Sequence, residues 1–153
     1  MKFWRKLNVR GLLSKWAARF HEPAASSRQT NPKSANRKKG DTGELLAYHF
    51  LRSNGYQIVA RKYKRRSGEI DLVGWDKDIL VFIEVKFRAH LEHGRPEEAV
   101  DFRKQKQICR VAKEYRITHQ LHDINYRFDI VSIQGFDQDR SLHVIKDAFK
   151  ERL

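Results

Sequence analysis

The stretch from Gly68 to Phe87 constrains this chain more than any other, because it joins two alternating strand patterns that contain unexpected charges. GEIDLVGW (68–75) and ILVFIEVKF (79–87) both alternate, and a short polar segment separates them, which is typical of a β-hairpin. In the second strand, alternation divides the side chains between two faces. Leu80, Phe82, Glu84 and Lys86 share one face, and Val81, Ile83, Val85 and Phe87 share the other.

The register of this hairpin follows from keeping the charged positions on one face. A tight turn at 77–78 pairs Asp71 with Glu84 and Glu69 with Lys86. A slip by one residue would place Asp71 opposite an apolar side chain and spoil both faces. Directly opposed Cβ atoms lie about 4.5–5.5 Å apart. We therefore expect the carboxyl groups of Asp71 and Glu84 to be neighbours.

Charged groups inside an apolar strand are costly to bury unless they are paired or hold a metal. Two facing carboxylates, Asp71 and Glu84, suit Mg²⁺ or Mn²⁺. Such a cation polarises a phosphodiester and lowers the pKa of water, while Lys86 orients that water or offsets developing charge. The alternative is a salt bridge between Glu84 and Lys86 on a half-exposed edge strand.

The other periodicities predict an α/β domain with the element order α-β-β-β-α-β. The expected elements are a helix at 41–54, strands at 57–63, 68–75 and 79–87, a helix at 96–117, strands at 125–133 and 142–146, and a helical turn at 147–150. Asp41 and Glu44 form a capping-box pattern at the start of the first helix. The strands before and after the long helix should form a parallel crossover, with helices covering both faces of a mixed sheet.

Basic residues are distributed unevenly along the chain. The sequence has 32 Lys and Arg against 19 Asp and Glu, a net charge of +13, of which residues 1–40 hold +10 and residues 41–153 only +3. We expect an extension at 1–39, with a basic amphipathic helix at 8–21 and a flexible linker at 22–39, followed by a domain at 40–153. The extension is a tail or self-packing helix, an arm on nucleic acid, or, less favoured, an anchor on a membrane surface through residues 1–20.

Length and composition exclude several classes of protein. A chain of 153 residues fits one globular domain, and a single cysteine, Cys109, excludes an internal disulfide. No run of about 18 apolar residues predicts a transmembrane helix, and the first twenty residues lack the pattern of a secretory signal. These features predict a cytoplasmic protein.

Asp71 followed by Glu84-Val85-Lys86 resembles the PD-(D/E)xK nuclease superfamily, which has the restriction-endonuclease-like fold. More closely, the chain resembles the YraN-like family of small uncharacterised bacterial proteins. Ile70 stands where the superfamily motif has proline, a departure that the YraN-like pattern shares. The likeness runs through segments 40–56, 68–76, 80–88, 94–104, 127–133 and 145–149.

The resemblance implies roles for single residues. Asp71 and Glu84 match the metal-binding acids, and Lys86 matches the catalytic lysine. Glu44 matches an acid that archaeal Holliday-junction resolvases of this fold place near their metal, although the residues alone favour a capping box equally. Lys104 matches a family lysine and is a candidate contact to the phosphates of nucleic acid, and the alternative is one more solvated charge.

The resemblance to the nuclease superfamily implies a metal-dependent nuclease-like protein that acts on DNA, including branched or damaged DNA. Lys62, Lys64, Arg65 and Arg66, at the end of the first strand and in the loop after it, would hold phosphates without reading sequence. Arg127 either meets phosphate or pairs with Asp129. The alternatives are a protein that keeps the fold but only binds nucleic acid or a partner, and a peripheral membrane protein. A homodimer is expected by analogy with other proteins of this fold.

Overall fold

The computed structural model describes residues 32–88, 100–135 and 140–151, and for 32–41 and 88 it describes the backbone alone. Its elements are α2 (Pro32–Ser53), β1 (Gln57–Arg65), β2 (Gly68–Asp76), β3 (Ile79–Arg88), α3 (Phe102–Thr118), β4 (Tyr126–Gln134) and β5 (Ser141–Phe149). The amphipathic helix expected at 8–21 lies outside these residues.

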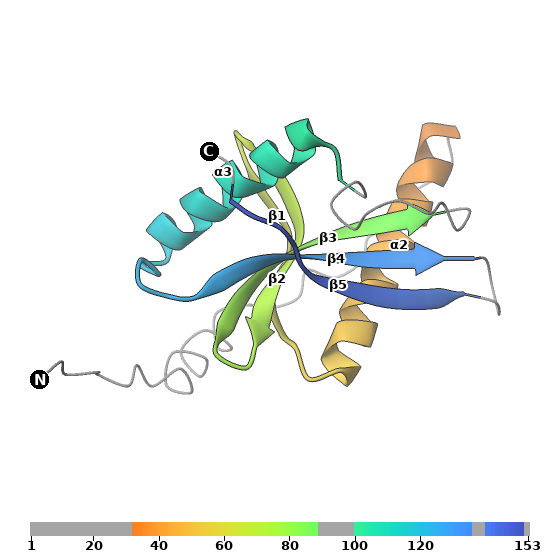
Figure 1. The fold of residues 1–153 in the computed structure, drawn as a ribbon. Helices are drawn as coiled ribbons and strands as arrows, with labels where there is room; N and C mark the ends of the chain where they lie inside the picture. The colour runs from red at the N-terminus through yellow and green to blue at the C-terminus, as the bar shows by residue number, and fades with distance from the viewer. Residues whose placement is uncertain (1–31, 89–99, 136–139, 152–153) are drawn as a thin grey trace, which may run out of the picture.

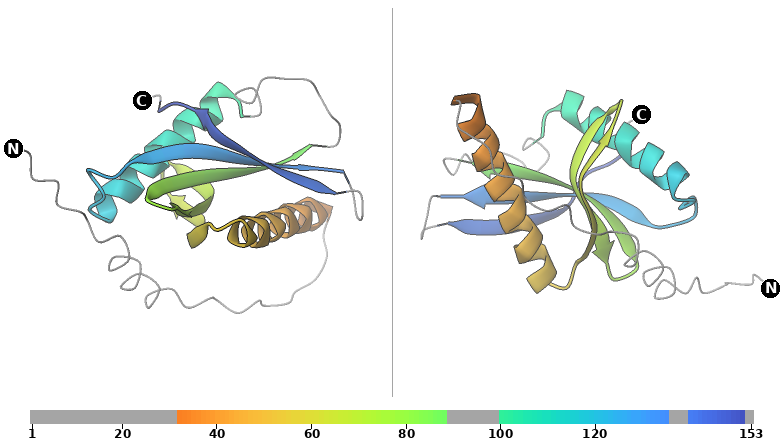
Figure 2. Two further views of the ribbon diagram at one scale, coloured as in Figure 1. Left: turned by 60° about the horizontal axis from the view of Figure 1, so that its bottom comes forward. Right: turned by 180° about the vertical axis from the view of Figure 1, so that it is seen from behind.

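One mixed sheet forms the centre of the fold. Its strands lie in the order β1-β2-β3-β4-β5; β3 and β4 are parallel, and the other neighbours are antiparallel. The predicted α/β class and the parallel crossover through α3 are both confirmed. Figures 1 and 2 show α2 and α3 on opposite faces of the sheet, as expected.

Each helix covers its own hydrophobic core. Alternation along β3 sends Leu80 and Phe82 into the core under α3, while Val81 and Ile83 enter the core under α2. The α3 side also contains Ile108, Val111, Ala112, Tyr115, Phe128 and Ile130, and the α2 side contains Ala47, Leu51, Leu72, Val131 and Ile133. The sheet is therefore buried on both faces, which leaves little room for an unpaired charge inside it.

The β2–β3 hairpin has the predicted register where its strands are paired. Asp76 pairs with Ile79 and Leu72 with Ile83, and the paired register ends there. On the N-terminal side of Leu72, β2 pairs with β1 alone, and the hairpin that they form turns toward α3 (Figure 1). Ile70 therefore belongs to the core under that helix. The loss of pairing opens the edge of β3 at this point.

Both helix starts differ from the sequence prediction. Helix α2 begins at Pro32, not at Asp41, and includes residues 32–39, which the sequence assigns to a flexible linker. Proline suits a first helical position, because its fixed φ matches the helix and its missing N–H has no helical partner there. Glu44 consequently lies inside the helix, so the capping-box interpretation is wrong.

Helix α3 begins at Phe102, so the expected start at Pro96 is wrong for a continuous helix. Asp101 is the N-cap, and its Oδ1 accepts the backbone N–H of Lys104 at 2.8 Å. A carboxylate in this position satisfies one of the helix's open N–H groups. Neither described helix is long and apolar enough to cross a membrane.

The predicted helical turn at 147–150 is wrong, because β5 continues to Phe149. The register of β4 and β5 shifts between Phe128 and Ile130, which marks a β-bulge. In this bulge Asp147 has a φ of 52°, and its backbone N–H donates to Oδ1 of Asp129 at 2.9 Å. The buried side chain of Asp129, in the neighbouring strand, thus keeps Asp147 in β5, although the sequence around Asp147 is typical of a turn.

Candidate functional site

The predicted acidic residues meet where β2 leaves β3. Asp71 lies just before the last paired residue of β2, and Glu84 follows the last paired residue of β3 in that hairpin. Oδ2 of Asp71 accepts the backbone N–H of Val85 at 2.7 Å. Asp71 is therefore fixed to the backbone of the strand that carries Glu84.

Glu84 is a buried carboxylate held between two lysines. Its exposed fraction is 4%, and Oε1 lies 3.4 Å from Nζ of Lys86. Oε2 lies 3.2 Å from Nζ of Lys104, in the first turn of α3. The expected pair of Glu84 and Lys86 is thus present, but its carboxylate is buried and is shared with a second lysine.

Burial dominates the electrostatics of this pair of acids. The pKa of Glu84 is raised to about 7, mainly by loss of solvent and also by the charge of Asp71, while Lys104 and Lys86 act in the opposite direction. Burial also raises the pKa of Asp71, against the lowering effect of the hydrogen bond from Val85. The two lysines therefore do not fully compensate the two acids, and the site favours additional positive charge.

Asp71 and Glu84 have the donor chemistry that suits a hard divalent cation. Mg²⁺ typically binds one or two carboxylates and completes its shell with water and substrate phosphates. Within the described ranges, no group of three or more His, Cys, Asp or Glu residues is arranged to hold a metal. The residues present therefore fit a cation that takes two ligands from the protein and the rest from water and substrate.

The third acid that the resemblance implies has a different partner. Oε2 of Glu44 lies 3.4 Å from Nζ of Lys62, in β1. Glu44 belongs to α2, whereas Glu84 contacts Lys104 of α3, and these two helices lie on opposite faces of the sheet. The assignment of Glu44 as a metal ligand stays a prediction.

The basic residues expected to hold phosphates are mostly engaged within the domain. Lys62 pairs with Glu44, and Lys64 pairs with Glu69 at 3.2 Å. The guanidinium of Arg65 lies over the ring of Tyr63, 4.4 Å from its centre. Glu69, expected opposite Lys86, is instead the partner of Lys64. Arg66 is exposed in the turn.

Lys104 is the site contact that sequence reasoning missed. The sequence offers it as a phosphate contact or a solvated charge, yet it lies 3.2 Å from Glu84 and is 24% exposed. Asp101 provides the available signal, because an N-cap at that position places Lys104 in the first turn of a helix that follows β3.

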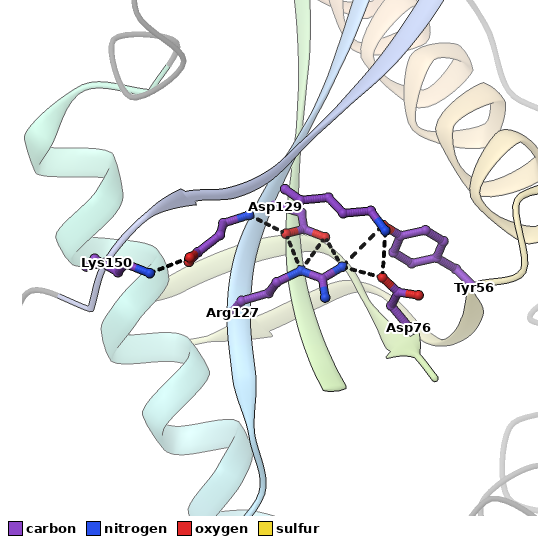
Figure 3. Close-up of polar contacts among 7 residues, drawn as sticks. Tyr56, Asp76, Arg127, Asp129 and Lys150 are labelled. Atoms are coloured by element: carbon purple, nitrogen blue, oxygen red, sulfur yellow. Dashed lines mark hydrogen bonds and ion pairs between the residues drawn. The ribbon is translucent and has the colours of Figure 1, made fainter. Parts of the chain in front are cut away.

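A second polar cluster lies at the other end of the paired part of the β2–β3 hairpin (Figure 3). Arg127 donates to Asp129 at 2.9 Å and to Asp76 at 2.6 Å, and Lys146 donates to Asp76 at 2.8 Å. Asp129 is completely buried. Arg127 is therefore paired, which decides between its two sequence interpretations.

Comparison with known proteins identifies relatives of nearly the same length as the domain. The family model described as "Uncharacterised protein family UPF0102" matches residues 43–133, which include both acids and both lysines of the site. A UPF0102 protein of Clostridium tetani is 40% identical over 119 residues, covering 76% of this chain and 98% of that protein. A UPF0102 protein of Chlorobium limicola is 43% identical over 118 residues, covering 73% and 92%. In agreement with the YraN-like resemblance, the chain therefore belongs to the UPF0102 family.

Proposed function

We propose that this protein is a metal-dependent nuclease-like protein that binds DNA and cleaves phosphodiester bonds, with Asp71 and Glu84 as ligands of Mg²⁺ or Mn²⁺. The observation that carries the proposal is the buried carboxylate of Glu84, held between Lys86 and Lys104 beside half-buried Asp71 at the open edge of β3. Buried acids with raised pKa values and a specific charged partner are typical of functional sites. The proposed location is the cytoplasm.

The residues of the site would divide the work as follows. A bound divalent cation would supply a Lewis acid that polarises the phosphodiester and lowers the pKa of water. Lys86 is 37% exposed and therefore accessible to solvent, so it would orient the attacking water and offset charge that develops on the phosphate. Lys104 would keep Glu84 ionised and oriented.

A second candidate function is nucleic-acid binding without cleavage. Both lysines already contact Glu84, so the cluster is partly neutralised without a cation. If the cluster only stabilises the fold, the protein could still bind DNA through its basic surfaces without cleaving it. The membrane-associated alternative depends on residues 1–20, outside the described residues.

A cleavage assay separates these functions. The full chain is incubated with linear, flap and four-way-junction DNA in Mg²⁺, Mn²⁺ or EDTA, beside Asp71→Asn and Lys86→Ala. We expect cation-dependent cleavage by the unmodified protein and a loss of about 100-fold or more in each variant. Asp71→Asn keeps an oxygen that can accept the N–H of Val85, so its loss of activity would reflect the lost charge.

Matched controls are Glu69→Gln and Lys77→Ala, which remove the same charges from β2 and from the exposed hairpin turn. Both should cleave as the unmodified protein does. Cleavage that survives Asp71→Asn and Lys86→Ala would place the activity elsewhere. DNA binding by the unmodified protein with no cleavage in either metal would support the second candidate.

A further inference from the structure

The outward face of α3 carries a row of basic residues. Helix α3 has six Lys and Arg and one acidic residue, so its net charge of +5 exceeds the +3 of the whole segment 41–153. Arg103, Lys106, Arg110 and Lys113 recur at intervals of three and four residues, which places them on one side of a helix. We call these four residues the α3 ridge.

The ridge is not explained by packing or by ion pairs. Arg103, Arg110 and Lys113 are exposed, and none of them forms an ion pair within the part of the chain that the structure describes. Lys106 lies over the ring of Phe102, 4.8 Å from its centre. The opposite face of α3, which includes Ile108, packs on the sheet. The cations are therefore available to a ligand, unlike those of β1.

The α3 ridge begins beside the candidate functional site. Lys104, between the first two ridge residues in sequence, contacts Glu84 at 3.2 Å. The β1–β2 hairpin lies along α3, where the rings of Tyr63 and Tyr115 are 4.8 Å apart (Figures 1 and 2). A Cβ at Gly68 would meet the side chain of Gln107, so the hairpin turn that carries Arg66 lies next to α3.

We propose that the α3 ridge binds the phosphate backbone of DNA and leads it to the candidate functional site. From Arg103 to Lys113 the helix rises about 15 Å, whereas one strand of B-DNA has a phosphate every ~3.4 Å of its axis. The ridge therefore spans about four phosphates of one strand. The proposal takes its class of ligand from the proposed function but does not require cleavage.

The composition of the ridge favours DNA over a membrane. A helix that lies in a lipid interface combines basic residues with a large apolar face that enters the membrane. The two exposed apolar residues on α3, Phe102 and Ile117, lie at opposite ends of the helix, and the ridge between them is cationic. A regular row of cations that form no ion pair with the described residues matches a regular polyanion.

The test measures affinity of the full chain for a fluorescent DNA duplex by anisotropy, in EDTA and over a range of salt concentrations. The ridge variant is Arg103→Gln/Arg110→Gln/Lys113→Gln. Its matched control is Arg52→Gln/Lys77→Gln/Lys150→Gln, which removes three exposed positive charges from other parts of the domain. Circular dichroism confirms that both variants are folded.

Each lost phosphate contact reduces the magnitude of the slope of log K against log salt by about 0.9. The three substitutions of the ridge variant should therefore reduce that slope by up to about 2.7. Affinity at 0.1 M salt should fall at least about tenfold in the ridge variant and change little in the control. An unchanged slope in the ridge variant, or an equal loss in the control, would overturn the proposal. Loss of binding to phosphatidylserine vesicles with unchanged DNA affinity would identify a lipid-binding surface instead.

The outcome is separable from that of the proposed function. If the ridge variant loses DNA affinity while the unmodified protein binds but cleaves nothing, the ridge is supported and the nuclease proposal fails. If the unmodified protein cleaves and the ridge variant binds DNA with unchanged affinity, the reverse holds.

Discussion

Replacing Glu84 by Gln tests the electrostatic basis of the site. Burial raises the pKa of Glu84 from its ordinary 4.5 to about 7 in the folded protein. The folded chain therefore holds this proton more tightly than the unfolded chain does. The resulting stabilisation is complete below pH 4.5 and is lost as the pH rises through 7. A shift of this size corresponds to about 3 kcal/mol of unfolding free energy, as an order of magnitude.

Glu84→Gln keeps the size of the side chain but cannot ionise. At pH 4.5 and below, the two proteins should differ little, because Glu84 is then neutral in the folded state of the unmodified protein. By pH 8 the unmodified protein should have lost about 3 kcal/mol relative to the variant. The variant is thus expected to be more stable at high pH, even though it removes two ion pairs.

Urea unfolding followed by circular dichroism from pH 4.5 to 8.5, with EDTA present, measures this difference. Glu69→Gln is the matched control, because that carboxylate is one-third exposed (33%) and pairs with Lys64. Its stability profile should run parallel to that of the unmodified protein. Parallel profiles for Glu84→Gln and the unmodified protein would refute the reasoning, since Glu84 would then ionise inside the fold without cost.

Three further predictions concern metal binding and the scaffold. Mg²⁺ should stabilise the unmodified protein at pH 8 by about 2.7 kcal/mol at 100 times its Kd, and Asp71→Asn should abolish this gain in a thermal-shift titration; an equal gain in the variant would place the cation elsewhere. Arg127→Met should lower the unfolding free energy by about 3–5 kcal/mol, because it leaves Asp129 buried and charged, and addition of Asp129→Asn should restore part of the loss. Gly68→Ala should cost about 1–3 kcal/mol in urea unfolding, because Gly68 has a φ of +144° and its new Cβ would lie 2.0 Å from Gln107; unchanged stability would contradict the strain argument.

The acidic pair was predictable because strand faces follow directly from residue numbers. Because side chains alternate along both strands, only registers that place the charged residues of the two strands on the same face keep both cores apolar. The observed pairing of Leu72 with Ile83 is one of these registers. The same alternation assigned Leu80 and Val81 correctly to opposite cores. These inferences needed only local geometry and the cost of burying charge.

The missed features depend on contacts between distant segments. Lys104 meets Glu84 only after α3 has packed across the sheet, and Asp147 stays in a strand only because Asp129 binds its backbone. The first helix was misplaced because a capping-box pattern also occurs inside helices, as Glu44 shows. Basic residues of β1 looked available in sequence, but Lys62 contacts α2 through Glu44.

The hydrogen bond from Val85 gives Asp71 a structural role in addition to its proposed role as a metal ligand. Asp71 stabilises the edge of β3 where pairing with β2 ends, so the fold benefits from this acid whether or not the protein cleaves phosphodiesters. Glu84 is different, because at neutral pH its ionised form is a burden on the fold that burial imposes. Loss of Glu84 in a UPF0102 protein would therefore cost the fold little, and under the proposed function its retention would reflect metal binding.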